Sequence, residues 1–122
     1  SQVNPEEVRT LTFCSGRFYY DLLAEREKLG RKDVALVRIE QLFPLPIEEL
    51  KLIIARYPNV TDYVWAQEEP KNMGAYGYML MNFDIVKWRL AAANAYSAPA
   101  PGSPMRHKAR HQEAIDKVFL AI

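Results

Sequence analysis

Two periods of hydrophobic and polar positions alternate along this chain. Runs rich in β-branched and aromatic residues predict strands, and apolar residues three or four positions apart predict helices. The predicted strands are residues 8–14, 34–39, 60–67 and 88–96, the last in spite of an alanine-rich core with helix propensity. The predicted helices are residues 17–29, 46–57, 74–84 and 105–120, the last with Ile115, Val118, Phe119 and Ile122 as its buried stripe. Residues 1–7 are expected to be a linker or a frayed end, and the Pro-rich residues 97–104 an irregular connection.

This alternation of strands and helices predicts an α/β fold with a largely parallel sheet. Right-handed crossovers bring the carboxyl ends of parallel strands to one edge of the sheet, where ligands and partners collect. Polar residues at or after these ends are therefore candidates for a rim or an interface, together with a histidine on the last predicted helix. They are Ser15, Arg38, Glu40, Gln67, Glu68, Glu69, Asn72 and His107.

Composition limits the function classes. A chain of 122 residues is one domain with room for a core, and its formal net charge of +1 gives no indication of a nucleic-acid or membrane-surface binder. Its apolar runs are far shorter than the roughly 20 residues of a membrane span. The single cysteine, Cys14, excludes an internal disulfide framework and suits a reducing compartment. The chain begins with Ser1 rather than Met, so it could be a processed protein or a piece of a longer one, and the resemblance described below favours the piece.

Two strand ends carry candidate chemistry. Ser15-Gly16 precedes a predicted helix whose free N–H groups can hold an anion, but a plain turn capped by the serine is favoured. Glu68 and Glu69 are adjacent, so on a strand they point to opposite faces and cannot both serve one acid–base reaction unless the turn has already begun. A solvated strand end is the favoured interpretation, and capping of the next helix or pairing with Arg38 is the nearest alternative. Glu40 faces the same choice.

The histidines and the cysteine are also candidate sites. His107 and His111 lie four positions apart on a predicted helix, a spacing at which two imidazoles can share a metal. No third ligand is visible nearby in the sequence, and three basic residues surround them, so a solvated basic turn is favoured. Cys14 would need one of these histidines as its base, and a buried structural thiol is favoured. The residues alone therefore give no catalytic, cofactor-binding or metal-binding assignment.

Several segments together resemble a known family. They are Cys14-Ser15-Gly16-Arg17, Tyr19-Tyr20-Asp21-Leu22, Val37-Arg38-Ile39-Glu40-Gln41-Leu42-Phe43-Pro44, Gln67-Glu68-Glu69-Pro70 and Ser97-Ala98-Pro99-Ala100. In this order they are similar to the C-terminal domain of the decarboxylating first component of 2-oxoglutarate dehydrogenase. The segments at 39–44 and 67–70 are the specific ones.

The resemblance implies a transketolase C-terminal-like fold with three layers and a mixed, mostly parallel sheet of about five strands flanked by helices. It implies that residues 8–122 are one domain of a longer, homodimeric enzyme that uses thiamine diphosphate and Mg²⁺. That parent decarboxylates 2-oxoglutarate and passes the succinyl group to a lipoyl group of the dihydrolipoyl succinyltransferase core. The family's catalytic motifs have no counterpart here, so the chain alone is expected to bind no cofactor and to be inactive. Its expected location is the cytoplasm of a bacterium or the mitochondrial matrix of a eukaryote.

One departure from the family affects the rim. Family members carry a basic residue just before the small residues that precede Ser97, where this chain has Ala91-Ala92-Ala93-Asn94-Ala95. An anion contact that family members make from this strand end is therefore not expected in this chain. The alternative function is a regulatory module that binds an anion or a nucleotide at the strand-end rim and the His107 turn. A freestanding enzyme that uses Cys14 is a third, weaker hypothesis.

Overall fold

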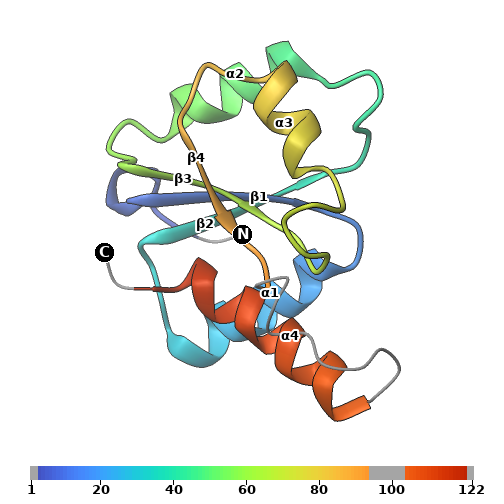
Figure 1. The fold of residues 1–122 in the computed structure, drawn as a ribbon. Coiled ribbons are helices and arrows are strands. Elements are labelled where there is room, and N and C mark those ends of the chain that lie inside the picture. The colour runs from blue at the N-terminus through green and yellow to red at the C-terminus, as the bar shows by residue number, and fades with distance from the viewer. Residues whose placement is uncertain (1–2, 94–103, 121–122) are drawn as a thin grey trace.

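The predicted elements are present in the computed structural model (Figure 1), which describes the backbone of residues 3–93 and 104–120 and the side chains of residues 3–93 and 109–120. In chain order the elements are the 3-10 helix η1 (Pro5–Glu7), β1 (Thr10–Ser15), α1 (Phe18–Leu29), β2 (Val34–Ile39), α2 (Ile47–Arg56), β3 (Asp62–Ala66), α3 (Tyr76–Asn82), β4 (Trp88–Ala91) and α4 (Pro104–Val118). The predicted irregular connection at 97–103 lies outside the described residues.

The described strands form one parallel sheet in the order β2-β1-β3-β4. α2 and α3 lie over one face of the sheet, and α1 and α4 lie over the other, which gives three layers (Figure 1). The expected α/β architecture is thus confirmed. Within the described residues the sheet has four strands, all parallel, where a mixed sheet of about five was expected.

Each face of the sheet carries its own apolar core. One core joins α1 and α4 to the sheet through Phe18, Leu22, Val64, Ala114 and Ile115, among others. The other joins α2 and α3 to the sheet through Phe13, Leu50, Trp65, Met79 and Phe83, among others. β1 lies between two strands and under helices on both faces, so every residue of this strand except the last is buried.

Helix ends follow the local signals of the sequence. α1 ends at Gly30, whose left-handed backbone (φ 65°) lets its N–H donate to the carbonyls of Arg26 and Glu27. α2 begins after Pro46 and carries two glutamates in its first turn, where the helix dipole favours them. None of the described helices combines the length and the apolar character that a membrane crossing needs.

The region of ambiguous propensity is a strand. β4 pairs with β3 from Tyr63↔Trp88 to Ala66↔Ala91, and Trp88 and Ala91 are buried in this register. The remainder of the predicted strand, at 94–96, lies outside the described residues.

The closing helix α4 packs as its apolar stripe predicts. Ile115, Val118 and Phe119 are buried, and Ile122 lies outside the described residues.

Arg89 on β4 joins the end of α4 to the sheet by hydrogen bonds. Its guanidinium donates to Asp62 on β3, with Nη2–Oδ2 at 2.9 Å and Nε–Oδ1 at 3.0 Å. Its Nη1 also donates to the carbonyl of Lys117 at 2.6 Å. Lys117 Nζ in turn donates to the carbonyl of Ala92 at 2.7 Å. The last carbonyls of a helix favour a cation, so this pair of basic residues joins β3, β4 and α4.

The N-terminal segment contacts the loop before β3. Residues 1–7 were expected to be a linker or a frayed end, and within them η1 forms with the side chain of Asn4 accepting from the N–H of Glu6 at 3.0 Å. The carbonyl of Glu6 accepts from Asn59 Nδ2 at 2.9 Å. The domain boundary at residue 8 stays a prediction.

Candidate functional site

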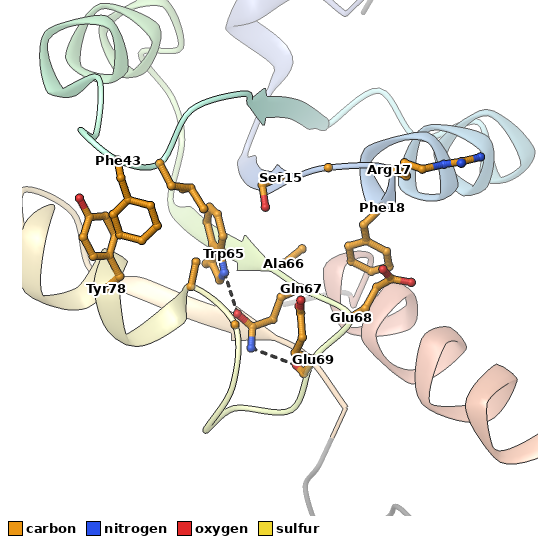
Figure 2. Close-up of a pocket in the computed structure, with 14 residues that line it drawn as sticks. Ser15, Arg17, Phe18, Phe43, Trp65, Ala66, Gln67, Glu68, Glu69 and Tyr78 are labelled. Carbon is orange, nitrogen blue, oxygen red and sulfur yellow. Dashed lines mark hydrogen bonds between the residues drawn. The ribbon is translucent and has the colours of Figure 1, made fainter. Parts of the chain in front are cut away.

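The carboxyl ends of β1 and β3 form a crevice at one edge of the sheet. These strands are neighbours in the sheet. The helix that follows β1 is α1 and the helix that follows β3 is α3, and they lie on opposite faces, so the two connecting loops diverge (Figure 1). Ligand sites of open α/β sheets lie at such switch points. A hollow of about 400 Å³ lies here, and we call it the rim hollow. Its lining includes Ser15 and Phe18 on one side and Phe43 and Tyr78 on the other, with Trp65 between them (Figure 2).

Gln67 organises the turn that borders the rim hollow. Only 4% of this residue is exposed. Its Oε1 accepts from Trp65 Nε1 at 2.9 Å and from the N–H of Tyr76 at 3.2 Å. Its Nε2 donates to carbonyls across the turn, the closest being that of Met73 at 2.7 Å. Because both ends of this buried amide are bonded within the protein, Gln67 anchors the turn and leaves no free polar atom for a ligand.

Gly74 closes the same turn against Gln67. Its φ of 72° lies in the left-handed region, which glycine adopts without strain. A Cβ at this position would lie 2.9 Å from Gln67 Oε1 and 3.1 Å from Glu69 Oε1. The turn therefore needs a glycine here both for its backbone conformation and for the space that Gln67 fills.

The two adjacent glutamates line the rim hollow and are exposed to solvent. Glu68 Oε1 lies 2.9 Å from His111 Nδ1 on α4. The alternative that a glutamate caps the next helix is wrong, because the residue before α3 is Ala75 and no side chain caps that end. With their side chains in water and directed differently, the glutamates do not form an acid–base pair (Figure 2).

Arg38 and Glu40 line a different hollow, beside β2 and the start of α2. Arg38 Nη1 donates to the hydroxyl of Tyr20 at 3.2 Å, and its guanidinium lies over the Tyr20 ring at 5.4 Å from the ring centre. The alternative that Arg38 pairs with a strand-end glutamate is therefore wrong. The cause is the strand order, which places β2 on the far side of β1 from β3.

The remaining candidates lie around the rim hollow to different degrees. Ser15 is half-buried at the end of β1 and lines the hollow, whereas Asn72 is exposed in the turn after β3. His107 belongs to α4 by its backbone, and its side chain lies outside the described residues. Of the eight candidates, the structure thus brings Ser15, Gln67, Glu68 and Glu69 to one hollow.

Cys14 is a structural thiol in the core. It is fully enclosed in β1, with Sγ 3.8 Å from the carbonyl oxygen of Val37. Burial raises the pKa of the Cys14 thiol to about 12, and the nearby charge of Arg38 lowers it by less. Because the thiolate is the nucleophile, a thiol with this pKa is unreactive at neutral pH. The hypothesis of an enzyme that uses Cys14 has no support in this environment.

Sequence reasoning missed one cluster beside the rim hollow. His111 faces Glu68 with Nδ1 and faces Asp21 with Nε2, the latter at 3.1 Å from Oδ2. The sequence shows no third ligand close to the histidines, whereas the fold brings carboxylates to His111 from α1 and from the end of β3. The available signal was a carboxylate in the first turn of the helix that follows β1.

Comparison with known proteins decides the family. The model of the 2-oxoglutarate dehydrogenase C-terminal family matches residues 1–119. The chain belongs to this family. The resemblance to this family, for which the segments at 39–44 and 67–70 were the specific ones, is thereby confirmed over nearly the whole chain. In this chain the first residue of the Gln-Glu-Glu-Pro segment is the one that holds the turn after β3.

Curated relatives of this chain are much longer. The mouse 2-oxoadipate dehydrogenase complex component E1 is 39% identical over 124 residues, which cover 98% of this chain and 14% of that protein. The 2-oxoglutarate dehydrogenase E1 components of Haemophilus influenzae and Azotobacter vinelandii are each 40% identical, over 94% and 96% of this chain. The chain spans 13–14% of the length of these relatives.

Proposed function

We propose that this chain is the C-terminal domain of the E1 component of a 2-oxoglutarate dehydrogenase, and that it supports the dimer and the active-site architecture of that enzyme. The family match over residues 1–119 carries the proposal. The interior of the rim turn agrees with a structural task, because the polar atoms of Gln67 are bonded within the protein.

The proposed parent enzyme decarboxylates 2-oxoglutarate with thiamine diphosphate and Mg²⁺. It then passes the succinyl group to a lipoyl group of the dihydrolipoyl succinyltransferase core. The rim hollow is a poor fit for thiamine diphosphate, since its lining sets the two carboxylates of Glu68 and Glu69 against the single guanidinium of Arg17 at the start of α1. The cofactor and the chemistry are therefore assigned to other domains of the parent.

One face of the domain supports a packed neighbour. Exposed large apolar residues are concentrated on α2, α3 and the loops beside them, and these two helices lie together over one face of the sheet (Figure 1). They are Phe43, Ile47, Leu52, Leu80, Met81 and Ile85, and we call this set the α2–α3 face. Apolar side chains gathered on one face mark a protein contact. We assign this contact to the remaining domains of the parent or to its dimer mate.

The alternative, a regulatory module for an anion or a nucleotide, has less support. Anions would meet the carboxylates of Glu68 and Glu69 in the rim hollow, and Arg38 lies in the other hollow against Tyr20. Calorimetry with AMP and with acetyl-CoA separates the two proposals. Binding that is lost on charge reversal of Arg38 would favour the regulatory module.

The direct test compares the isolated chain with its full-length parent. With thiamine diphosphate and Mg²⁺, the parent is expected to release CO₂ from 2-oxoglutarate, and the isolated 122-residue chain is expected to release none. A parent that lacks these residues is expected to be inactive and to lose its dimer in light-scattering measurements. Turnover by the isolated chain, or an active dimer without it, would contradict the proposal.

2-Oxoadipate is the second substrate to test, because the mouse relative of similar identity is named for it. The two acids differ by one methylene group, which a pocket discriminates by only about 1–3 kcal/mol. We expect the parent to have the higher kcat/KM for 2-oxoglutarate. The reverse preference would change the proposed substrate and would leave the proposed role of the domain unchanged.

The proposed compartment is that of the parent enzyme, which is the cytoplasm of a bacterium or the mitochondrial matrix of a eukaryote.

A further inference from the structure

We propose that Asp21, Glu68 and His111 bind a divalent transition-metal ion. Asp21 lies on α1, Glu68 follows β3 and His111 lies on α4, so the folded sheet brings together residues that are far apart in the chain. Taking one ligand atom from each residue, the three atoms lie within 4.8 Å of one another. Imidazole nitrogens and carboxylate oxygens are common ligands of such ions. We call these residues the metal cluster.

The metal cluster can hold one ion after its side chains rotate. In a tetrahedral site with ligands at about 2.1 Å from the ion, the ligand atoms are about 3.4 Å apart, so a pair at the outer limit of 4.8 Å has to close by about 1.4 Å. The side chains of Asp21 and Glu68 are about half exposed and can rotate to do so. His111 is the fixed member, since its ring packs edge-on against Phe18 with the ring centres 5.3 Å apart.

The two contacts of His111 agree with the way proteins orient metal-binding histidines. One imidazole nitrogen can bind the ion while the other keeps its N–H directed at a carboxylate. Both nitrogens already face carboxylate oxygens, at 2.9 Å for Glu68 and 3.1 Å for Asp21. A carboxylate that accepts this N–H cannot reach an ion on the opposite nitrogen, so the carboxylate beside the bound nitrogen is the second ligand and the other has to rotate toward the ion to become the third.

Charge and access around the cluster favour a hydrated cation. Glu68 and His111 line a hollow of about 420 Å³ that also contains Glu69 and Arg110. Among the described side chains at this hollow, the carboxylates of Asp21, Glu68 and Glu69 outweigh the charge of Arg110. Water can enter the hollow and complete the coordination, as in metal sites with three protein ligands. One nitrogen ligand favours Zn²⁺ or a similar ion over Mg²⁺ and Ca²⁺, which take oxygen ligands.

Calorimetry with Zn²⁺ as the probe tests the proposal on the 122-residue chain, free of any purification tag. His111→Gln is expected to lower the affinity for Zn²⁺ by about tenfold or more, and Asp21→Asn and Glu68→Gln are each expected to lower it as well. Zn²⁺ is also expected to raise the thermal midpoint of the wild-type chain, because it binds the folded state and joins three elements. EDTA should reverse this rise, and the His111→Gln protein should not show it.

His107→Gln is the matched control, because the two histidines share a helix and, among the described side chains, His111 is the one that lies beside Asp21 and Glu68. It is expected to leave the affinity for Zn²⁺ unchanged. Equal losses in His107→Gln and His111→Gln, with no loss in either carboxylate variant, would place the ion on the helical histidine pair and overturn the proposal. A wild-type chain that binds no Zn²⁺ at millimolar concentration would overturn it too, since the contacts would then be an ion pair only. Circular dichroism of each variant confirms that it is folded.

Discussion

At the scale of single residues, Gln67 and Gly74 meet inside the turn after β3, and the side chain of the first fills the space that a methyl group on the second would need. The sequence marks this turn by its neighbouring charges, yet Glu68 and Glu69 are exposed while the amide between the strand and the glutamates is buried. A residue next to conspicuous charges can thus be the one that determines the local structure.

Gly74→Ala is predicted to destabilise the protein more than Gly30→Ala does. Both glycines have a positive φ, 72° and 65°, so both variants carry a similar backbone strain of about 1–2 kcal/mol. At Gly30 no atom lies within 4 Å of the new Cβ, whereas at Gly74 it would lie 2.9 Å from Gln67 Oε1. We expect a further loss of about 1 kcal/mol or more in the free energy of unfolding, measured in urea. Equal losses in the two variants would contradict this account of the turn.

Cys14 is predicted to be inert in the folded protein. Burial raises its pKa to about 12, so almost no thiolate is present at neutral pH. A thiol reagent such as Ellman's reagent is expected to react only after denaturant unfolds the chain, at one thiol per molecule. Cys14→Ser supplies the blank, and rapid labelling of the folded wild-type chain would show that β1 opens readily.

At the scale of elements, Arg31 joins the loop after α1 to the end of the chain's last helix. Its Nε and Nη2 donate to the two carboxylate oxygens of Asp33, at 2.8 and 3.1 Å. Its Nη1 donates to the carbonyl of Phe119 at 2.8 Å. The pair therefore stabilises the contact between two elements that are separated by most of the sequence.

The Arg31–Asp33 pair is predicted to make stability depend on pH in acid. The hydrogen bond that Arg31 donates to Asp33 lowers the pKa of the Asp33 carboxyl group in the folded state. The stabilisation is therefore present above the unfolded pKa of about 3.9 and is lost as the pH falls through the lowered folded value. Because the pair is partly exposed, Asp33→Asn should cost less than about 1 kcal/mol at neutral pH.

Urea unfolding of wild type and Asp33→Asn over a range of pH checks this sign. The difference between the two proteins should shrink to nothing in strong acid. Glu7→Gln, at an exposed acidic residue of η1, is the control. A difference that grows as the pH falls would contradict the role of Arg31.

Much of the fold was predictable at this scale, because hydrophobic period and chain breakers act locally. β2 has the predicted bounds, since a charged loop precedes its apolar run and Glu40 follows it. α3 begins later than predicted, because the turn that Gln67 holds occupies the residues before it. The partners of His111 were not predictable, because Asp21 and Glu68 reach it only through the packing of α1 and α4 on the sheet.

At the scale of the whole molecule, the α2–α3 face is predicted to be the surface that contacts the remaining domains of the parent or its dimer mate. Leu52→Glu and Met81→Glu place charge on side chains that are 68% and 85% exposed. In the isolated chain each should change the free energy of unfolding by less than about 0.5 kcal/mol. In the parent each should weaken the dimer or the packing of the domains, measured by light scattering and by activity.

Leu29→Glu is the matched control for that face. Leu29 is also exposed, but it ends α1 on the opposite face of the sheet. It should leave both the isolated chain and the assembly of the parent unchanged. If all three variants leave the parent intact, the α2–α3 face is not its interface. The family could be predicted from short segments, whereas the neighbour on this face could not, because its residues belong to other parts of the assembly.

α4 comes after every other described element in the sequence, yet it covers the sheet face on which Phe18 and Leu22 of α1 are buried. During synthesis the sheet and α1 emerge from the ribosome before this cover exists, and domains acquire their structure as the chain appears. The nascent chain therefore has an interval in which an apolar surface is open to aggregation or to a protease. A chaperone that shields this surface until α4 arrives would raise the yield of folded protein, and a chain stopped before α4 would be removed by proteolysis.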